Sequence, residues 1–247
     1  MEMVSRKDNV WKREDLDRRY LDGVRCAIPL AEYQIQVILY LVGKTLPRLK
    51  SFLDLGCGDG ILGRAVLSNY PKVKGIFLDF SDTMIEAARK KAPKNNKNLV
   101  FITEDYGKPG WVKSVAKYGK QDLIISGFSI HHQKDHRKKS IYREIFDLLK
   151  PGGLFLNLEH VASATPRLQH VFDEFFIDAL YEYHLSLDRN TKRKTIAKEH
   201  YNNPCRKANI LSPVEKQCLW LREMGFKEVD CYLKIFELAL FGGIKPG

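Results

Sequence analysis

The chain has 247 residues, which is the size of one large domain or of one domain with a sizeable insert. Hydrophobic residues make up 44% and charged residues 29%, a balance that excludes a disordered chain, a collagen-like repeat and a small disulfide-rich protein. The net charge of +11 favours contact with anions such as phosphates, RNA or acidic lipid head groups, although basic residues on solvated faces explain the same excess.

The cysteines and the apolar runs bear on the cellular compartment of the protein and on membrane contact. The five cysteines are widely spaced and contain no Cys-x-x-Cys pair, so the sequence predicts neither a disulfide framework nor a metal site. The amino terminus lacks the apolar core of a signal peptide, and the longest apolar run, around Val37–Val42, is much shorter than a membrane span. We therefore expect a soluble cytoplasmic protein without membrane contact. Its oligomeric state is left open, with a homodimer as one alternative.

The amino-terminal part of the chain precedes the first predicted strand. In and just beyond Tyr20–Leu41, apolar side chains at Ile35, Ile38, Leu39 and Val42 recur at helical spacing. We therefore expect residues 1–49 to form a helical cap that packs on the sheet.

A regular series of short apolar runs then predicts a parallel sheet. The runs alternate with helix-like stretches, which is typical of parallel strands joined by right-handed crossover helices. The predicted strands are Ser51–Leu55, Lys74–Asp79, Leu99–Thr103, Asp122–Gly127 and Leu154–Glu159, followed by terminal strands at Lys227–Lys234 and Ile235–Gly242. The fold class is therefore a doubly wound α/β sheet in a single domain, residues 1–247.

Local signals mark where the helices begin and end. Ser81 precedes one helical pattern, and a second apolar stripe ends at Leu149, just before a Lys-Pro-Gly-Gly sequence. Further on, Ser212–Glu215 predicts a capping box with proline at the first helical position, and Gly225 predicts the end of that helix.

Residues 161–211 interrupt the α/β alternation and should be mostly helical. Thr165 and Pro166 are a suitable helix start, and apolar residues then recur as adjacent pairs four positions apart. Two interpretations of this stripe remain open, namely simple core packing and an insert whose inner face closes over a substrate. The stripe consists of Val171, Phe172, Phe175, Phe176, Ala179, Leu180 and Tyr183.

A glycine-rich segment joins the first strand to the following helix. It begins at Asp54 and contains Gly56, Gly58 and Gly60. Glycines let the backbone turn sharply and approach a ligand, and the start of the helix offers unpaired N–H groups to polar or anionic atoms. The spacing DxGxGxG differs from the GxGxxG of pyrophosphate-binding dinucleotide folds. We interpret the unit as a nucleotide-cofactor site.

Acidic residues end the next two strands. Asp79 lies about twenty residues after the last loop glycine, where such folds place the acceptor for ribose hydroxyls. Asp105 follows the third strand and could accept a hydrogen bond from an adenine amino group. The alternatives are that Asp79 merely caps the helix that begins at Ser81 and that Asp105 is a surface-turn residue.

These motifs resemble those of the class I S-adenosylmethionine-dependent methyltransferases over residues 50–243. FLDLGCGDG resembles the glycine-rich motif, FLDF the ribose acid, ITEDY the adenine-side acid, and LLKPGGLFLNLEH the entry into the fifth strand. The resemblance implies S-adenosyl-L-methionine as cofactor and a seven-stranded mixed sheet with an antiparallel last strand. It also implies that Phe80 and Tyr106 flank the adenine and that Ser126 lies near methionine and substrate.

Three histidines are candidate catalytic bases. His131 and His132 follow the fourth strand and His160 ends the fifth, so all three lie at the edge where the site is expected. A base near neutral pKa assists methyl transfer to a hydroxyl, phenol or ammonium acceptor. At most one of His131 and His132 should face the pocket if the chain stays extended there. The alternative is a structural role for each histidine.

The amino-terminal Arg25 and Tyr33 could reach the cofactor carboxylate or the substrate, or lie on the surface. The leading hypothesis is a methyltransferase that acts on a small molecule. The alternatives are an RNA-modifying methyltransferase, suggested by basic clusters after residue 88 and along the insert, and a non-catalytic cofactor-binding protein. A further variant modifies the cofactor itself, as carboxy-S-adenosylmethionine synthases do. The loop spacing disfavours a nicotinamide oxidoreductase.

Overall fold

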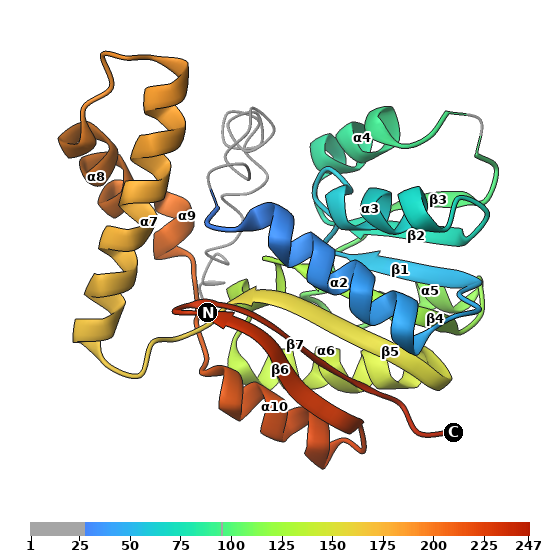
Figure 1. The fold of residues 1–247 in the computed structure, drawn as a ribbon. Helices are drawn as coiled ribbons and strands as arrows, with labels where there is room; N and C mark the ends of the chain where they lie inside the picture. Colours follow the sequence, from blue (N-terminus) through green and yellow to red (C-terminus); the bar gives the residue numbers. More distant parts are fainter. Residues whose placement is uncertain (1–27, 95) are drawn as a thin grey trace, which may run out of the picture.

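The computed structural model describes residues 28–94 and 96–247 (Figure 1). Within these residues, one sheet contains seven strands in the order β3-β2-β1-β4-β5-β7-β6. β1 to β5 run parallel, whereas β7 is antiparallel to both of its neighbours, β5 and β6. This confirms the doubly wound seven-stranded mixed sheet. The bounds are β1 Ser51–Leu55, β2 Lys74–Asp79, β3 Leu99–Thr103, β4 Gln121–Gly127, β5 Leu149–His160, β6 Lys227–Ile235 and β7 Leu238–Ile244.

Helices cover both faces of this sheet (Figure 1). One face is packed by α2 (Ala31–Thr45), α3 (Ile61–Asn69) and α4 (Asp82–Lys91), whose buried side chains share a core cluster with Phe52 and Phe77. The other face is packed by α5 (Val112–Ala116), α6 (Asp135–Leu148) and α10 (Val214–Glu223), around Trp111 and Phe155. Among the described residues, no helix combines the length and the apolar character that crossing a bilayer requires.

The described part of the amino-terminal cap is the helix α2. Ile38 and Val42 are buried against the sheet, as their spacing predicts, and Gln34 is buried beside them with its amide donating to the Pro29 carbonyl at 2.9 Å. The remainder of the expected cap, residues 1–27, lies outside the described residues, and so does the candidate residue Arg25.

Several helix boundaries agree with their sequence signals. The Ser81 hydroxyl accepts from the Met84 N–H at the start of α4, and the Thr165 hydroxyl accepts from the Leu168 N–H at the start of α7 (Pro166–Leu187). Gly225 follows α10 with a φ of 101°, a left-handed conformation that glycine adopts without strain.

The predicted capping box at the start of α10 is wrong. Pro213 occupies the N-cap position, so it precedes the first helical residue instead of filling it. The Ser212 hydroxyl donates to Asp135 at 2.6 Å and accepts from Lys138 at 2.6 Å. These partners lie more than seventy residues away in sequence, and a local motif does not reveal them.

Two strand boundaries also differ from expectation. β5 begins at Leu149, so this residue belongs to the strand and not to the preceding helical stripe. The terminal hairpin turns at Phe236 and Glu237, and Ile235 still pairs with Leu238, so the expected second strand began too early. Neither turn residue is a glycine, asparagine or proline, although Phe236 adopts a φ of 51°.

The insert after β5 is helical and stands beyond the carboxyl ends of the parallel strands (Figure 1). It comprises α7, α8 (Arg193–Asn202) and α9 (Pro204–Lys207). Within the predicted stripe on α7, Phe172 is buried, whereas Val171 and Phe175 are exposed. The apolar stripe is therefore only partly used for packing.

A buried hydrogen-bond network beneath α6 gives a stability prediction. The Tyr142 hydroxyl donates to Gln217 Oε1 at 2.5 Å and accepts from Asn157 Nδ2 at 3.2 Å, and the Tyr142 side chain is fully buried. Tyr142→Phe should lower the free energy of unfolding by about 1–3 kcal/mol, because both partners lose a bond inside the core. Urea unfolding checks this. Tyr40→Phe, at a largely exposed tyrosine, is the matched control, and equal losses in both variants would contradict the assignment.

Candidate functional site

The loop between β1 and α3 bends through three glycines. Gly56, Gly58 and Gly60 have φ values of 67°, 54° and 79°, in the left-handed region that favours glycine. A Cβ atom on Gly56 would lie 1.9 Å from Ser129 Oγ, so the loop approaches the segment after β4 too closely for any side chain at this position. The loop therefore passes directly under the end of β4.

Two buried carboxylates hold this loop in place. Asp54 Oδ2 accepts from the Gly63 N–H at 2.8 Å, in the first turn of α3, where backbone donors lack helical partners. Asp79, at the end of β2, accepts from the Gly58 N–H at 2.9 Å and from the Ser81 N–H at 3.0 Å. Asp79 thus ties the glycine loop to the turn that begins α4.

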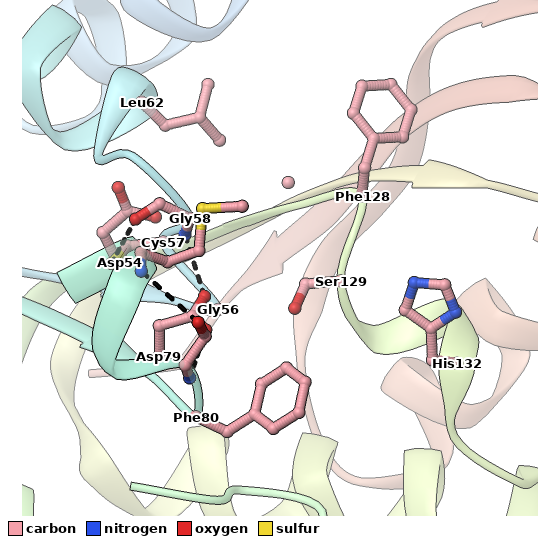
Figure 2. A pocket seen from close by; sticks show the side chains of 13 residues that line it. Asp54, Gly56, Cys57, Gly58, Leu62, Asp79, Phe80, Phe128, Ser129 and His132 are labelled. Atoms are coloured by element: carbon pink, nitrogen blue, oxygen red, sulfur yellow. Dashed lines mark hydrogen bonds between the residues drawn. The ribbon is translucent and has the colours of Figure 1, made fainter. Parts of the chain in front are cut away.

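An open pocket lies beside the loop, and the space between its walls is about 580 Å³ when the solvent in its mouth is included. Figure 2 shows the loop and Asp79 on one side of it, Phe80 at its base, and Phe128, Ser129 and His132 on the other side. It is a concave site at the carboxyl ends of parallel strands, where open α/β sheets bind ligands. The lining residues are Asp54, Gly56, Cys57, Gly58, Leu62, Asp79, Phe80, Ser81, Met84, Gly127, Phe128, Ser129 and His132.

The structure brings five of the predicted cofactor-binding residues to this pocket, namely Asp54, Gly56, Gly58, Asp79 and Phe80. Gly60 lies just beyond the lining, as the residue that precedes α3.

Three other predicted residues lie outside the lining. The Tyr106 hydroxyl shares a 2.5 Å hydrogen bond with Ser129 Oγ, and Tyr106 is buried behind the loop. Ser126 Oγ donates to the Leu55 carbonyl at 2.7 Å. Asp105 Oδ1 accepts from the Gly107 N–H at 2.9 Å in the turn after β3.

The two adjacent histidines have different surroundings. They lie on a short 3₁₀ turn, η3 (Ile130–His132), not on an extended strand. His132 lines the pocket, whereas His131 is buried and places Nδ1 2.6 Å from Glu159 Oε2. Their ring centroids lie 4.0 Å apart. One histidine of the pair therefore faces the pocket.

Burial favours the neutral forms of both His131 and Glu159. Burial raises the pKa of the Glu159 carboxyl to about 7, against the opposing charge of Lys138. Burial also lowers the pKa of His131 well below its usual value, and the nearby His160 lowers it further. Below about pH 7 the pair is therefore neutral, and the protonated carboxyl of Glu159 donates to Nδ1 of His131.

His160 lies apart from the pocket, at the end of β5. Its Nε2 is 2.7 Å from Glu237 Oε2, and its Nδ1 is 3.2 Å from Asn209 Nδ2. It lines a second cavity beneath the insert. Ser129, Glu159 and Glu237 had no predicted role, and one available signal was that Glu159 immediately precedes a candidate histidine in β5.

Comparison with known proteins finds similarity to methyltransferases in part of the chain and over most of its length. Residues 52–153 match the methyltransferase domain family. A malonyl-acyl-carrier-protein O-methyltransferase of Ilyobacter polytropus is 34% identical over 43% of this chain and 38% of its own length. A carboxy-S-adenosyl-L-methionine synthase of Shewanella piezotolerans is 24% identical over 91% of this chain and 88% of its own length. The solved structure of an O-methyltransferase family protein from Burkholderia thailandensis matches with a TM-score of 0.68 at 18% identity, over 99% of this chain and 64% of that one.

The raised pKa of Glu159 predicts a pH-dependent stability. Protonation is favoured by folding, so this contribution is fully present below the unfolded pKa near 4.5 and is lost as the pH rises to about 7. Glu159→Gln mimics the protonated carboxyl, accepting from the Ile130 N–H and donating to His131. Relative to wild type, the variant should gain up to about 3 kcal/mol in unfolding free energy between these pH values.

Urea unfolding from pH 5 to pH 8 measures this difference. Glu215→Gln, at an exposed carboxyl on α10, controls for the loss of one charge and should show a nearly constant difference from wild type. A flat difference for Glu159→Gln across the same range would show that Glu159 is ionised in the folded protein throughout.

Proposed function

We propose, from the premise that the chain belongs to the class I S-adenosylmethionine-dependent methyltransferase family, that it transfers a methyl group to a nucleophilic O, N or C atom of a small molecule. The observation that carries the proposal is the joining of the glycine loop to Asp79 at the mouth of an open pocket. When bound, S-adenosylmethionine supplies an electrophilic methyl group on its sulfonium. The protein's task is then to position an acceptor in line with it in a water-poor site.

The residues present fit this cofactor. The Asp79 carboxylate lines the pocket, and its two oxygens offer about four acceptor positions, so it is suited to accept from ribose hydroxyls. Phe80 offers an aromatic face at the pocket base for adenine. Gly56 and Gly58 leave the backbone accessible, since no Cβ covers it. We assign cofactor binding to these residues together with Asp54 and Gly60, which shape the loop.

The acceptor side of the pocket is assigned to His132. It lies across the pocket from the glycine loop, where an acceptor would meet the methyl group (Figure 2). Its ring is placed to take a proton from a hydroxyl or amine acceptor. We assign His131 a positioning role, because it packs behind His132 and hydrogen-bonds Glu159 instead of facing the pocket.

Ion pairs formed by the basic residues within the protein favour a small-molecule acceptor over RNA. Lys91 pairs with Asp59 at 2.8 Å, and Arg193 pairs with Glu174 at 2.8 Å and with Asp178 at 2.6 Å. Parts of both basic clusters are thus engaged within the protein. A further group of lysines lines a groove with the amino-terminal residues of β1 and β2, at the edge opposite the pocket, and comprises Lys50, Lys72, Lys74, Lys120 and Lys150.

A second candidate function is modification of the cofactor itself. The alignment with the carboxy-S-adenosyl-L-methionine synthase extends over 91% of this chain, whereas the alignment with the O-methyltransferase extends over 43%. The extent of the first alignment supports this alternative. Mass spectrometry of small molecules extracted from the purified protein distinguishes the two, since only a synthase should retain a sulfonium that carries an additional carboxyl group.

The Asp79 assignment gives a binding prediction. Asp79→Asn removes the charge that would accept from the ribose hydroxyls, so the affinity for S-adenosylhomocysteine should fall by about 1–3 kcal/mol, or about 5- to 150-fold. Titration calorimetry measures it, with NAD as the comparison ligand and Asp147→Asn, an exposed residue on α6, as the matched control. Unchanged affinity in Asp79→Asn, or equal binding of NAD by wild type, would contradict the proposed function.

A further inference from the structure

A second cavity lies between the insert and the carboxyl end of β5. Its volume is about 280 Å³, close to the lower end of the range for small-molecule sites. Its walls come from α7, α9 and the segment after α9, together with the end of β5 and the β6–β7 turn. The lining residues are His160, Ala162, Ser163, Gln169, Arg206, Asn209, Leu211 and Glu237.

Glu237, in the β6–β7 turn, contributes a buried carboxyl group to this cavity. Only 2% of its surface is exposed, and its Oε2 lies 2.7 Å from His160 Nε2. Its Oε1 is buried and has no hydrogen-bond partner within the part of the chain that the structure describes. Buried polar oxygens are nearly always paired, with protein, water or a ligand, so a donor is expected at this position.

A chain of hydrogen bonds fixes the orientation of His160. The Asn209 amide nitrogen can only donate, so Nδ1 of His160 accepts and Nε2 carries the hydrogen that it donates to Glu237. The His160 ring also contacts the His131 ring, which in turn contacts Glu159. Glu237 Oε2 therefore accepts one hydrogen bond, from His160, and Glu237 Oε1 accepts none from this network.

The charge balance of the cavity favours a cationic ligand. Arg206 lines the wall, but its guanidinium donates to Asp173 Oδ2 at 2.5 Å, and His200 contacts the same carboxylate at 2.9 Å. Apart from His160 and Glu237, the other described lining residues are uncharged, namely Ala162, Ser163, Gln169, Asn209 and Leu211. A carboxylate in such a wall is best satisfied by a group that brings both N–H donors and positive charge.

We propose that this second cavity binds the amino group of a small-molecule amine, with Glu237 as its hydrogen-bonding anchor. The ring centroids of His160, His131 and His132 follow one another at 5.9 and 4.0 Å, so one imidazole ring separates the two cavities. That another part of the same molecule extends to His132 and accepts the methyl group rests on the proposed function. Amine binding itself does not.

Three probes of similar size and skeleton test the proposal. Phenethylamine, phenethyl alcohol and hydrocinnamate carry an ammonium, a hydroxyl and a carboxylate, and titration calorimetry gives their affinities for the full chain with and without saturating S-adenosylhomocysteine. Phenethylamine should bind about tenfold tighter than the alcohol, and hydrocinnamate should bind more weakly than either. Glu237→Gln keeps an oxygen for His160 but removes the charge, so it should abolish the preference for the amine, whereas Glu215→Gln should retain it.

Two further measurements guard against a folding defect. Glu237→Gln should bind S-adenosylhomocysteine as wild type does. Gln169→Lys, at an exposed lining position on α7, should weaken amine binding by charge repulsion and leave the alcohol nearly unaffected. The proposal is overturned if no probe binds, if amine and alcohol bind equally, or if Glu237→Gln keeps the preference. Failure of S-adenosylhomocysteine to bind wild type would instead contradict the proposed function, and the amine result would still report on the cavity.

Discussion

The candidate site depends on the contact between the Asp79 carboxylate and two backbone N–H groups, those of Gly58 and Ser81. These bonds join the loop after β1 to the turn after β2, and the glycine conformations make the joining possible. Gly56 must lack a side chain because Ser129 occupies the space where a Cβ would lie. Strand order, glycine placement and one buried acid thus define one side of the pocket together. A change in any of them alters the surface presented to a nucleoside.

The sequence predicted the fold well because its signals are local. Each central strand is a short apolar run, and the glycine loop is set by conformational restrictions that hold wherever the motif occurs. Helix starts at Ser81 and Thr165 were equally readable, since their caps bond residues three positions away. Five of the predicted cofactor residues line the pocket for the same reason, because each lies within three residues of the carboxyl end of a predicted strand.

What escaped prediction depends on partners distant in the chain. Ser212 fits a capping box, but its hydroxyl bonds Asp135 and Lys138 on α6, more than seventy residues earlier in the chain. Glu237 contacts His160 across 77 positions, and no turn signal marked its hairpin. Tertiary packing also decided between the adjacent histidines, since a 3₁₀ turn directs one toward the pocket and the other into the protein.

In the proposed arrangement, the first pocket binds the nucleoside at the carboxyl edge of the sheet, and the second cavity, beneath the insert, binds an amino group. The most direct test is a crystal structure of the protein with S-adenosylhomocysteine. We expect the nucleoside to lie between the glycine loop and Phe80, with the ribose hydroxyls on the Asp79 carboxylate and the sulfur directed toward His132. A molecule bound elsewhere, or a hollow closed by side chains at saturating ligand, would contradict the account.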